Sequence, residues 1–294
     1  MFVTAIERAD QFTRPIHSIL RFWGSTSVVP GTATLFFVNS DGWALTCAHV
    51  ARQLAAAEAL LAKFTQFKAE RAAVPTGAKR RQALRALEKK HAYSDGTLVE
   101  LYNNFVNCVD GPLDLEAHLH PSLDVALLKF KNFTRLHCTT FPTFARPGSD
   151  LKQGKFLCRL GYPFPEFTNF EYDPTADQIR WVATGRPHTP RFPIEGMVTR
   201  HVADANGDII GFEVSTPGLR GQSGGPVFDA EARVWGMQSA TNHLDLDFDV
   251  DVEVLRAGKK KRIKESAFLH VGHCVHVDVL KRFMGDNGVQ FQEA

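Results

Sequence analysis

Short apolar runs alternate with polar turn residues along most of the chain. The stretch TATLFFVNSDGWALTCAHV contains two β-branched and aromatic runs separated by Asn39-Ser40-Asp41-Gly42, which predicts a β-hairpin. Similar short runs recur downstream, at 124–130, 155–163, 194–202, 207–215, 232–240 and 268–277. Many short strands bounded by Gly, Pro, Asn and Asp are typical of a β-barrel protein.

Residues 51 to about 107 break this pattern. Three segments, 51–73, 78–92 and 96–106, are predicted to be helical, with Pro75-Thr76-Gly77 between the first two. Leu54, Leu60, Leu61 and Phe64 have the spacing of an amphipathic helix. We therefore expect a helical insertion packed on the barrel. A short helix is also expected near the C-terminus, at 276–285.

The composition is that of an ordinary globular protein. Of 294 residues, 44% are hydrophobic and 22% are charged, so a sizeable core is available. The net charge of +2 gives no electrostatic reason to expect a nucleic acid or an acidic membrane surface as a partner. The basic residues of the second helical segment predict a solvated helix face instead; they are Lys79, Arg80, Arg81, Arg85, Lys89 and Lys90.

The first fifteen residues lack an apolar run, so we expect no signal peptide, and no stretch of about 18 apolar residues predicts a membrane span. The five cysteines are scattered and show no CxxC spacing. We therefore expect reduced thiols, a cytoplasmic protein, and neither a disulfide framework, a metal site nor a cofactor.

Three segments carry residues suited to nucleophilic catalysis, in the order His49, Asp124, Ser223. A serine hydroxyl becomes nucleophilic beside a base, and histidine serves as that base near neutral pH. A buried carboxylate fixes the imidazole tautomer. The glycines around Ser223 let backbone N–H groups point into one cavity, and we expect those of Gly221 and Ser223 to form an oxyanion hole.

The three segments resemble the motifs of trypsin-like serine peptidases. Thr46-Cys47-Ala48-His49-Val50 is similar to their histidine motif, and LDVALLKF from Leu123 is similar to their aspartate motif. Gly221-Gln222-Ser223-Gly224-Gly225-Pro226 is similar to their GDSGGP serine motif, and the chain order matches as well. Within the family, the loop from Gly161 and the strand from Gly236 resemble HtrA/Deg-like proteases without a PDZ domain.

The resemblance implies a mostly β fold with two six-stranded antiparallel β-barrels, a helical insertion and a C-terminal helix. The barrels are expected at about 18–140 and 141–282 of one peptidase domain spanning 1–294, with the insertion at about 51–107. Family disulfides are not expected, because Val50 and Asp229 stand at two of their positions. Gln222 replaces the Asp that pairs with a newly cut amino terminus in secreted zymogens, so another device must order the oxyanion loop.

The resemblance also implies where the substrate side chain is recognised. Pro217 occupies the position that is Asp in trypsins, and Gln238 the position that is His in glutamyl-specific relatives. We therefore expect a small-to-medium apolar or polar side chain in the pocket. The expected substrate-binding residues are Pro217, Gln238, Ser239, Ala240, Gly272 and Cys274.

The segment LDLDFDVDVE at 244–253 predicts a half-exposed strand, and the basic segment at 256–264 predicts a solvated loop. If this part of the chain lies near the cleft, its acids would favour a basic substrate residue.

The resulting hypothesis is a cytosolic, regulated serine endopeptidase that cuts a protein or peptide substrate. The alternative is an interaction module that retains the triad, in which the helical insertion binds a regulatory protein partner.

Overall fold

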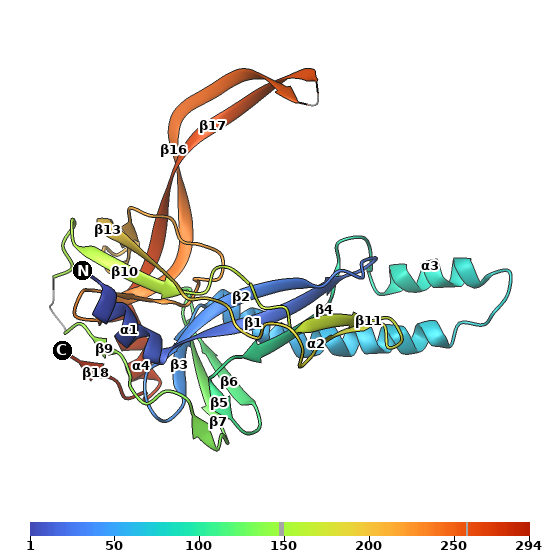
Figure 1. Cartoon of the computed structure of the whole chain (residues 1–294), viewed down its shortest axis with the longest axis horizontal. Helices are drawn as coiled ribbons and strands as arrows, with labels where there is room; N and C mark the ends of the chain where they lie inside the picture. The colour runs from blue at the N-terminus through green and yellow to red at the C-terminus, as the bar shows by residue number, and fades with distance from the viewer. Residues whose placement is uncertain (147–149, 257) are drawn as a thin grey trace.

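The computed structural model describes residues 1–146, 150–256 and 258–294, and its strands form two main sheets (Figure 1). The mostly β fold class expected from the sequence is confirmed. One large hydrophobic core extends through both sheets, with Phe36 from the first and Phe228 from the second among its fully buried side chains. Among the described residues, no helix is long and apolar enough to cross a membrane.

Six strands form the N-terminal sheet, and every neighbouring pair is antiparallel. In spatial order they are β4 (Leu98–Phe105), β1 (Thr13–Phe22), β2 (Val29–Phe37), β3 (Trp43–Thr46), β7 (Ala126–Lys131) and β6 (Asp114–Leu119). In the described part of the chain, the end strands β4 and β6 do not pair with each other, so this sheet is curled but open.

The hairpin expected around Asn39 to Gly42 is present between β2 and β3. Asn39 Oδ1 accepts a hydrogen bond from the Asp41 N–H at 3.1 Å, which closes the turn. Gly42 has a φ of +83°, and a Cβ there would lie 2.8 Å from the Phe130 carbonyl oxygen. The turn therefore needs glycine at this position.

The prediction of a helix at 96–106 is wrong, because Leu98–Phe105 form strand β4. This strand pairs with β1 over most of its length, with Leu101 opposite Leu20 and Phe105 opposite Ile16. The apolar spacing of the segment also fits a helix, and only the distant pairing with β1 decides between the two. The helical insertion expected up to residue 107 therefore ends before β4.

The C-terminal sheet contains eight strands. In spatial order they are β15 (Pro226–Phe228), β10 (Phe156–Gly161), β13 (Phe192–Ala203), β14 (Ile209–Val214), β17 (Lys259–His276), β16 (Arg233–Arg256), β9 (Thr143–Phe144) and β18 (Gln292–Glu293). A further pairing of β15 with β16 closes a ring of six antiparallel strands. The short strands β9 and β18 lie outside this ring and pair in parallel.

Two small two-stranded sheets and four helices complete the described structure. One pairs β5 (Val109–Asp110) with β8 (Arg135–Leu136), and the other is a hairpin of β11 (Phe170–Asp173) and β12 (Gln178–Trp181). The helices are α1 (Val3–Phe12), α2 (Ala48–Ala72), α3 (Arg80–Lys90) and α4 (Val277–Asp286). Helix α4 is the expected C-terminal helix, and α3 buries none of its side chains, as a solvated face predicts.

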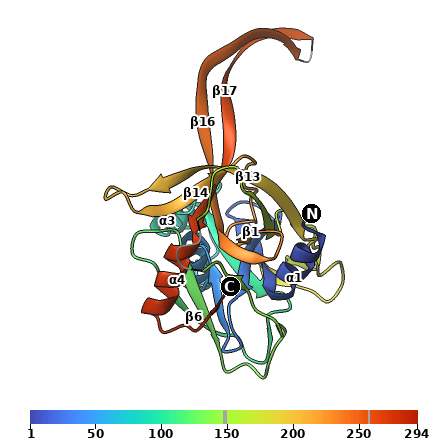
Figure 2. The same ribbon diagram turned by 90° about the vertical axis from the view of Figure 1, so that its left-hand side faces the viewer.

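The distal parts of β16 and β17 form a long hairpin arm that extends away from the rest of the molecule in both views (Figures 1 and 2). The basic segment expected to be a loop instead continues as strand from Lys259; Ala257 within it lies outside the described residues. On the arm, Asp251 pairs with Arg262 and Glu253 with Lys260. These two acids thus have basic partners on the arm itself.

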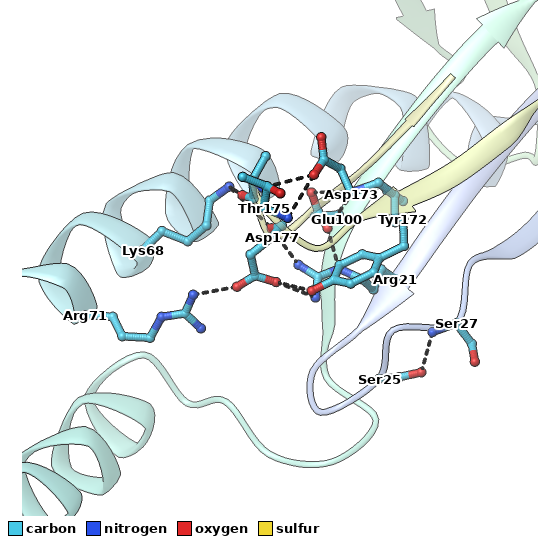
Figure 3. Close-up of polar contacts among 12 residues, drawn as sticks. Arg21, Ser25, Ser27, Lys68, Arg71, Glu100, Tyr172, Asp173, Thr175 and Asp177 are labelled. Atoms are coloured by element: carbon cyan, nitrogen blue, oxygen red, sulfur yellow. Dashed lines mark hydrogen bonds and ion pairs between the residues drawn. The ribbon is translucent and has the colours of Figure 1, made fainter. Parts of the chain in front are cut away.

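A partly buried ion-pair network connects α2 to the N-terminal sheet (Figure 3). Arg21 of β1 is 4% exposed and contacts Glu100 of β4 at 2.5 Å and Asp177 at 3.1 Å. Asp177, in the turn between β11 and β12, in turn accepts a hydrogen bond from Arg71 of α2 at 2.5 Å. The C-terminal end of α2, which carries Arg71, is therefore held against strands β1 and β4.

Removing Glu100 should destabilise the fold strongly, because it leaves the buried Arg21 charge with Asp177 alone. We expect Glu100→Ala to lower the free energy of unfolding by about 3 kcal/mol, measured by urea denaturation. Glu171→Ala is the control: it breaks an exposed pair with Arg180 and should cost less than about 1 kcal/mol. Equal losses in the two variants would contradict the structural role of the network.

Candidate active site

Asp124 receives three hydrogen bonds from two different parts of the chain. It lies two residues before the start of β7, and its Oδ2 is 2.8 Å from His49 Nδ1. The same Oδ2 accepts a hydrogen bond from Ser239 Oγ at 2.6 Å, and Oδ1 accepts one from the backbone N–H of His49 at 2.9 Å. One carboxylate therefore fixes the imidazole, the start of α2 and a residue of β16.

The start of α2 explains why this carboxylate is needed. The first N–H groups of a helix have no acceptor within the helix, and its N-terminus carries partial positive charge. Cys47, the residue before the helix, makes no side-chain hydrogen bond that caps it. Asp124, from the segment before β7, takes this role by accepting the N–H of His49 in the first turn of α2.

The surroundings of Asp124 keep it ionised. Burial alone would raise its pKa, but the hydrogen bonds from the His49 side chain, from Ser239 and from the His49 backbone outweigh burial. Together they hold the pKa of Asp124 well below its usual range. An ionised carboxylate at Nδ1 leaves Nε2 of His49 as the nitrogen that can exchange a proton with another group.

Ser223 faces the same cavity as His49. This cavity has a volume of about 290 Å³, and strands β1 and β2, the start of α2 and the Ser223 turn line it. Ser223 Oγ donates a hydrogen bond to the Ser239 carbonyl oxygen at 3.3 Å, and in the described part of the chain no hydrogen bond joins it to His49. The hydroxyl must therefore turn toward Nε2 before it can give up its proton.

The turn before Ser223 requires glycine at position 221. Gly221 has a φ of +95°, and a Cβ there would lie 2.4 Å from Thr32 Oγ1 and 2.5 Å from the Tyr162 carbonyl oxygen. Among the described residues, the N–H groups of Gly221 and Ser223 have no acceptor. Two unpaired N–H groups next to the hydroxyl suit a negatively charged oxygen.

Hydrogen bonds within the chain hold this turn in place. Thr34 of β2 donates from Oγ1 to the Gly221 carbonyl at 2.6 Å and from its N–H to the Ser223 carbonyl at 3.0 Å. The buried Gln222 side chain donates to the Phe192 carbonyl and accepts from the Leu219 N–H. The turn is thus ordered by β2 and by Gln222. The position of Gln222 is the one at which the sequence comparison above expects Asp in secreted zymogens.

The sequence around this site matches one protein family. The family described as "Trypsin-like peptidase domain" matches residues 31–237, which include His49, Asp124 and Ser223. The chain belongs to this family. Its membership supports a serine peptidase with a trypsin-like fold, as the motifs predicted.

Among solved structures, the active form of the Rv3671c protease from M. tuberculosis is 13% identical, with a TM-score of 0.47 over 98% of this chain and 86% of that one. The HtrA-type protease AlgW with a tripeptide is 11% identical, with a TM-score of 0.47 over 97% of this chain. That match spans only 62% of AlgW. A search of curated protein sequences found no significant match.

The residues expected to bind substrate in this trypsin-like peptidase lie in two groups. Ser239 and Ala240 follow each other on β16, where the Ser239 hydroxyl contacts Asp124 and the Ala240 carbonyl accepts from Gln238 Nε2 at 2.7 Å. Of the second group, Gln238, Gly272 and Cys274 are buried and Pro217 is half-buried. The sequence predicts Ser239 in the substrate pocket and gives no sign of its hydrogen bond to Asp124.

One residue in contact with the second group was not predicted from the sequence. Arg159 of β10 is 1% exposed and contacts Gln238 and Pro217 by hydrogen bonds. A Cβ on Gly272 would lie 2.2 Å from its Nη1 atom. An arginine within the apolar run KFLCRLGYP was the available signal, since charged residues in such runs are rarely buried without a role.

Within the described residues, Cys47, His49 and Asp124 form the one group whose ligand atoms are close enough together to bind a metal ion. Burial and the nearby Asp124 carboxylate raise the pKa of Cys47 well above its ordinary value, which keeps the thiol protonated. Its Sγ donates to the Gln238 carbonyl oxygen at 3.3 Å. These contacts suit a packed thiol beside a His–Asp pair better than a metal ligand.

The low pKa of Asp124 predicts a pH-dependent stability. Its contribution should be fully present above its unfolded pKa of about 3.9 and should be lost as pH falls toward the lower folded pKa. The destabilisation caused by Asp124→Asn should therefore be larger at pH 7 than at pH 3, measured by urea unfolding. Asp41→Asn, at an exposed site, is the control. A destabilisation by Asp124→Asn that is the same at both pH values would contradict the assignment.

Proposed function

We propose that this chain is a serine endopeptidase that hydrolyses peptide bonds of a protein substrate through an acyl-enzyme. Ser223 acts as the nucleophile, His49 as the general base and then acid, and Asp124 as the carboxylate that orients His49. The observation that carries the proposal is the 2.8 Å contact between His49 Nδ1 and Asp124, on the cavity that Ser223 also lines. Family membership supports the same chemistry.

In the first step Ser223 Oγ attacks the substrate carbonyl carbon while His49 Nε2 takes its proton. The carbonyl oxygen becomes an oxyanion, which the N–H groups of Gly221 and Ser223 stabilise. His49 then gives the proton to the leaving amine as the C–N bond breaks. In the second step water attacks the acyl-enzyme, with His49 again as base, and Ser223 is released with its proton.

We further propose a reducing, cytosolic location and regulation through the insertion. All five cysteines are free thiols in the structure, which supports a reducing compartment. The base His49 and the insertion belong to one helix, α2, so a partner that moves this helix would move the base. A displacement of about 1 Å at a reacting group costs about 100-fold in rate.

The alternative is a protein-interaction module in which the insertion binds a partner and hydrolysis is secondary. The observation that favours this alternative is that helix α3 exposes a basic surface and buries none of its residues. A covalent fluorophosphonate probe distinguishes the two. Labelling of Ser223 supports the enzyme, and absence of labelling with or without a partner supports the module.

Ser223→Ala should abolish hydrolysis of a peptide substrate and leave the fold intact, because it removes the nucleophile alone. His49→Ala should lose nearly as much, since the members of a triad act as a unit. Asp124→Asn should lower kcat by about 10⁴-fold, the order of loss that this change causes in a Ser-His-Asp triad, because Nδ1 then meets the wrong tautomer. Rates of all three variants near that of the parent would refute the triad; folding is checked by circular dichroism.

Thr34→Val should slow hydrolysis up to about 100-fold at a nearly unchanged KM, because the Gly221 carbonyl loses its donor and the oxyanion hole loses its fixed geometry. Thr140→Val, whose hydroxyl bonds to Gln11 at an exposed site, is the matched control. If both variants hydrolyse at the parent rate, the hydrogen bond to Gly221 does not hold the turn.

A further inference from the structure

A polar cavity of about 580 Å³ lies where helix α1, the N-terminal sheet and the C-terminal sheet meet. Its lining residues come from α1, from β1 and from the loop before β13, together with Tyr162 directly after β10. In the described part of the chain, it shares no lining residue with the cavity at Ser223. Cavities of this size hold small organic molecules.

One wall of this cavity is the half-buried Arg14 of β1. Its Nε donates to the Asn107 carbonyl oxygen at 2.8 Å, and its Nη2 donates to that of His137 at 3.0 Å. Its Nη1 donates to the carbonyl oxygens of Asp10 and Thr13, both at 2.8 Å. These four contacts fix the guanidinium, and all four acceptors are neutral. Because an arginine carries five N–H groups, one Nη2–H has no acceptor within the described residues.

Of the two arginines that line the cavity, Arg14 is the one without a carboxylate partner among the described residues. The other, Arg191, forms an ion pair with Asp10 at 2.6 Å. A further carboxylate, that of Asp110, contacts Nε2 of the cavity residue His137 at 2.7 Å. Both carboxylates are therefore engaged by other side chains, and the positive charge of Arg14 is left for a ligand.

A buried hydroxyl in the same lining also lacks a partner. Thr189 lines the cavity and is 7% exposed, and its Oγ1 forms no hydrogen bond with any described residue. A buried polar group without a partner destabilises a fold, so such groups are rare in native proteins. A ligand that accepts the hydroxyl proton of Thr189 supplies the missing hydrogen bond.

Tyr162 connects the cavity to the turn that carries Ser223. It lines the cavity, and its backbone N–H donates to Thr34 Oγ1 at 3.3 Å. The same Oγ1 donates to the Gly221 carbonyl oxygen at 2.6 Å. A molecule in contact with Tyr162 is therefore two hydrogen bonds away from the Ser223 turn.

We propose that this cavity binds a small organic anion, which places a carboxylate or phosphate group against Arg14 and accepts a hydrogen bond from Thr189. An oxyanion is the group whose charge and shape best match a guanidinium. Gln11 and His188, which also line the cavity, offer polar groups to the rest of the ligand. The proposal does not depend on the peptidase function, because none of these residues takes part in the proposed hydrolysis.

Glycerol 3-phosphate, glycerate and glycerol test the proposal, because they share a three-carbon skeleton and differ in the charged group. Isothermal titration calorimetry of the full chain at constant ionic strength should show saturable binding of glycerol 3-phosphate or glycerate at millimolar concentration, and no binding of glycerol. Binding of glycerol 3-phosphate alone identifies a phosphate ligand, and binding of glycerate alone identifies a carboxylate ligand. If neither anion binds saturably, or if glycerol binds equally well, the proposal is overturned.

Two variants locate the binding site. Arg14→Met should weaken binding of the anion at least about 10-fold, because it removes a charged donor. Thr189→Val should weaken it about 3- to 10-fold without lowering the free energy of unfolding of the free protein, since the hydroxyl has no partner there. Arg180→Met is the control: it removes an exposed arginine paired with Glu171 and should bind like the parent.

An affinity of Thr189→Val equal to that of the parent would overturn the proposal, and so would equal losses in Arg14→Met and Arg180→Met. Thr189→Val keeps the test decisive even if Arg14→Met does not fold.

Discussion

The site depends on the placement of one carboxylate, that of Asp124. It reaches a helix N-terminus, an imidazole and a serine hydroxyl at once, and these groups come from α2 and β16. The N-terminal sheet supplies Asp124 and the C-terminal barrel supplies Ser239, so their hydrogen bond joins the two halves at the active site. Because three donors offset the cost of burial, the carboxylate stays charged where the proposed imidazolium would form.

The same elements that build the site extend beyond the body of the molecule. Helix α2 starts at the residue before His49 and runs 25 residues into the insertion. Strand β16 carries Gln238 and Ser239 and continues into the hairpin arm. A force applied to either extension would therefore reach a residue of the site through one continuous element. This physical connection is what the proposed regulation of the site through the insertion depends on.

Much of the fold and of the candidate site could be predicted from local sequence. The strand runs, the turn at Asn39 and the motifs around His49, Asp124 and Ser223 are short, and each contains its own signal.

Two features could not be predicted in this way. The strand Leu98–Phe105 has apolar spacing that suits a helix too, and its pairing with β1 joins residues about 80 positions apart. The second feature is the burial of Arg159. Its neighbours from Leu157 to Gly161 are all buried, so alternation along β10 does not reveal which side chains point into the barrel. Only the closed ring of strands brings its partners together.

The central claim is that an ionised Asp124 holds the Nδ1 proton of His49. A proton NMR spectrum of the protein tests it without a substrate, because a proton shared between imidazole and carboxylate resonates far downfield of the amides. We predict such a resonance in the parent and in Ser223→Ala, and its loss in Asp124→Asn. A parent without this resonance, or an Asp124→Asn protein that keeps it, would contradict the claim.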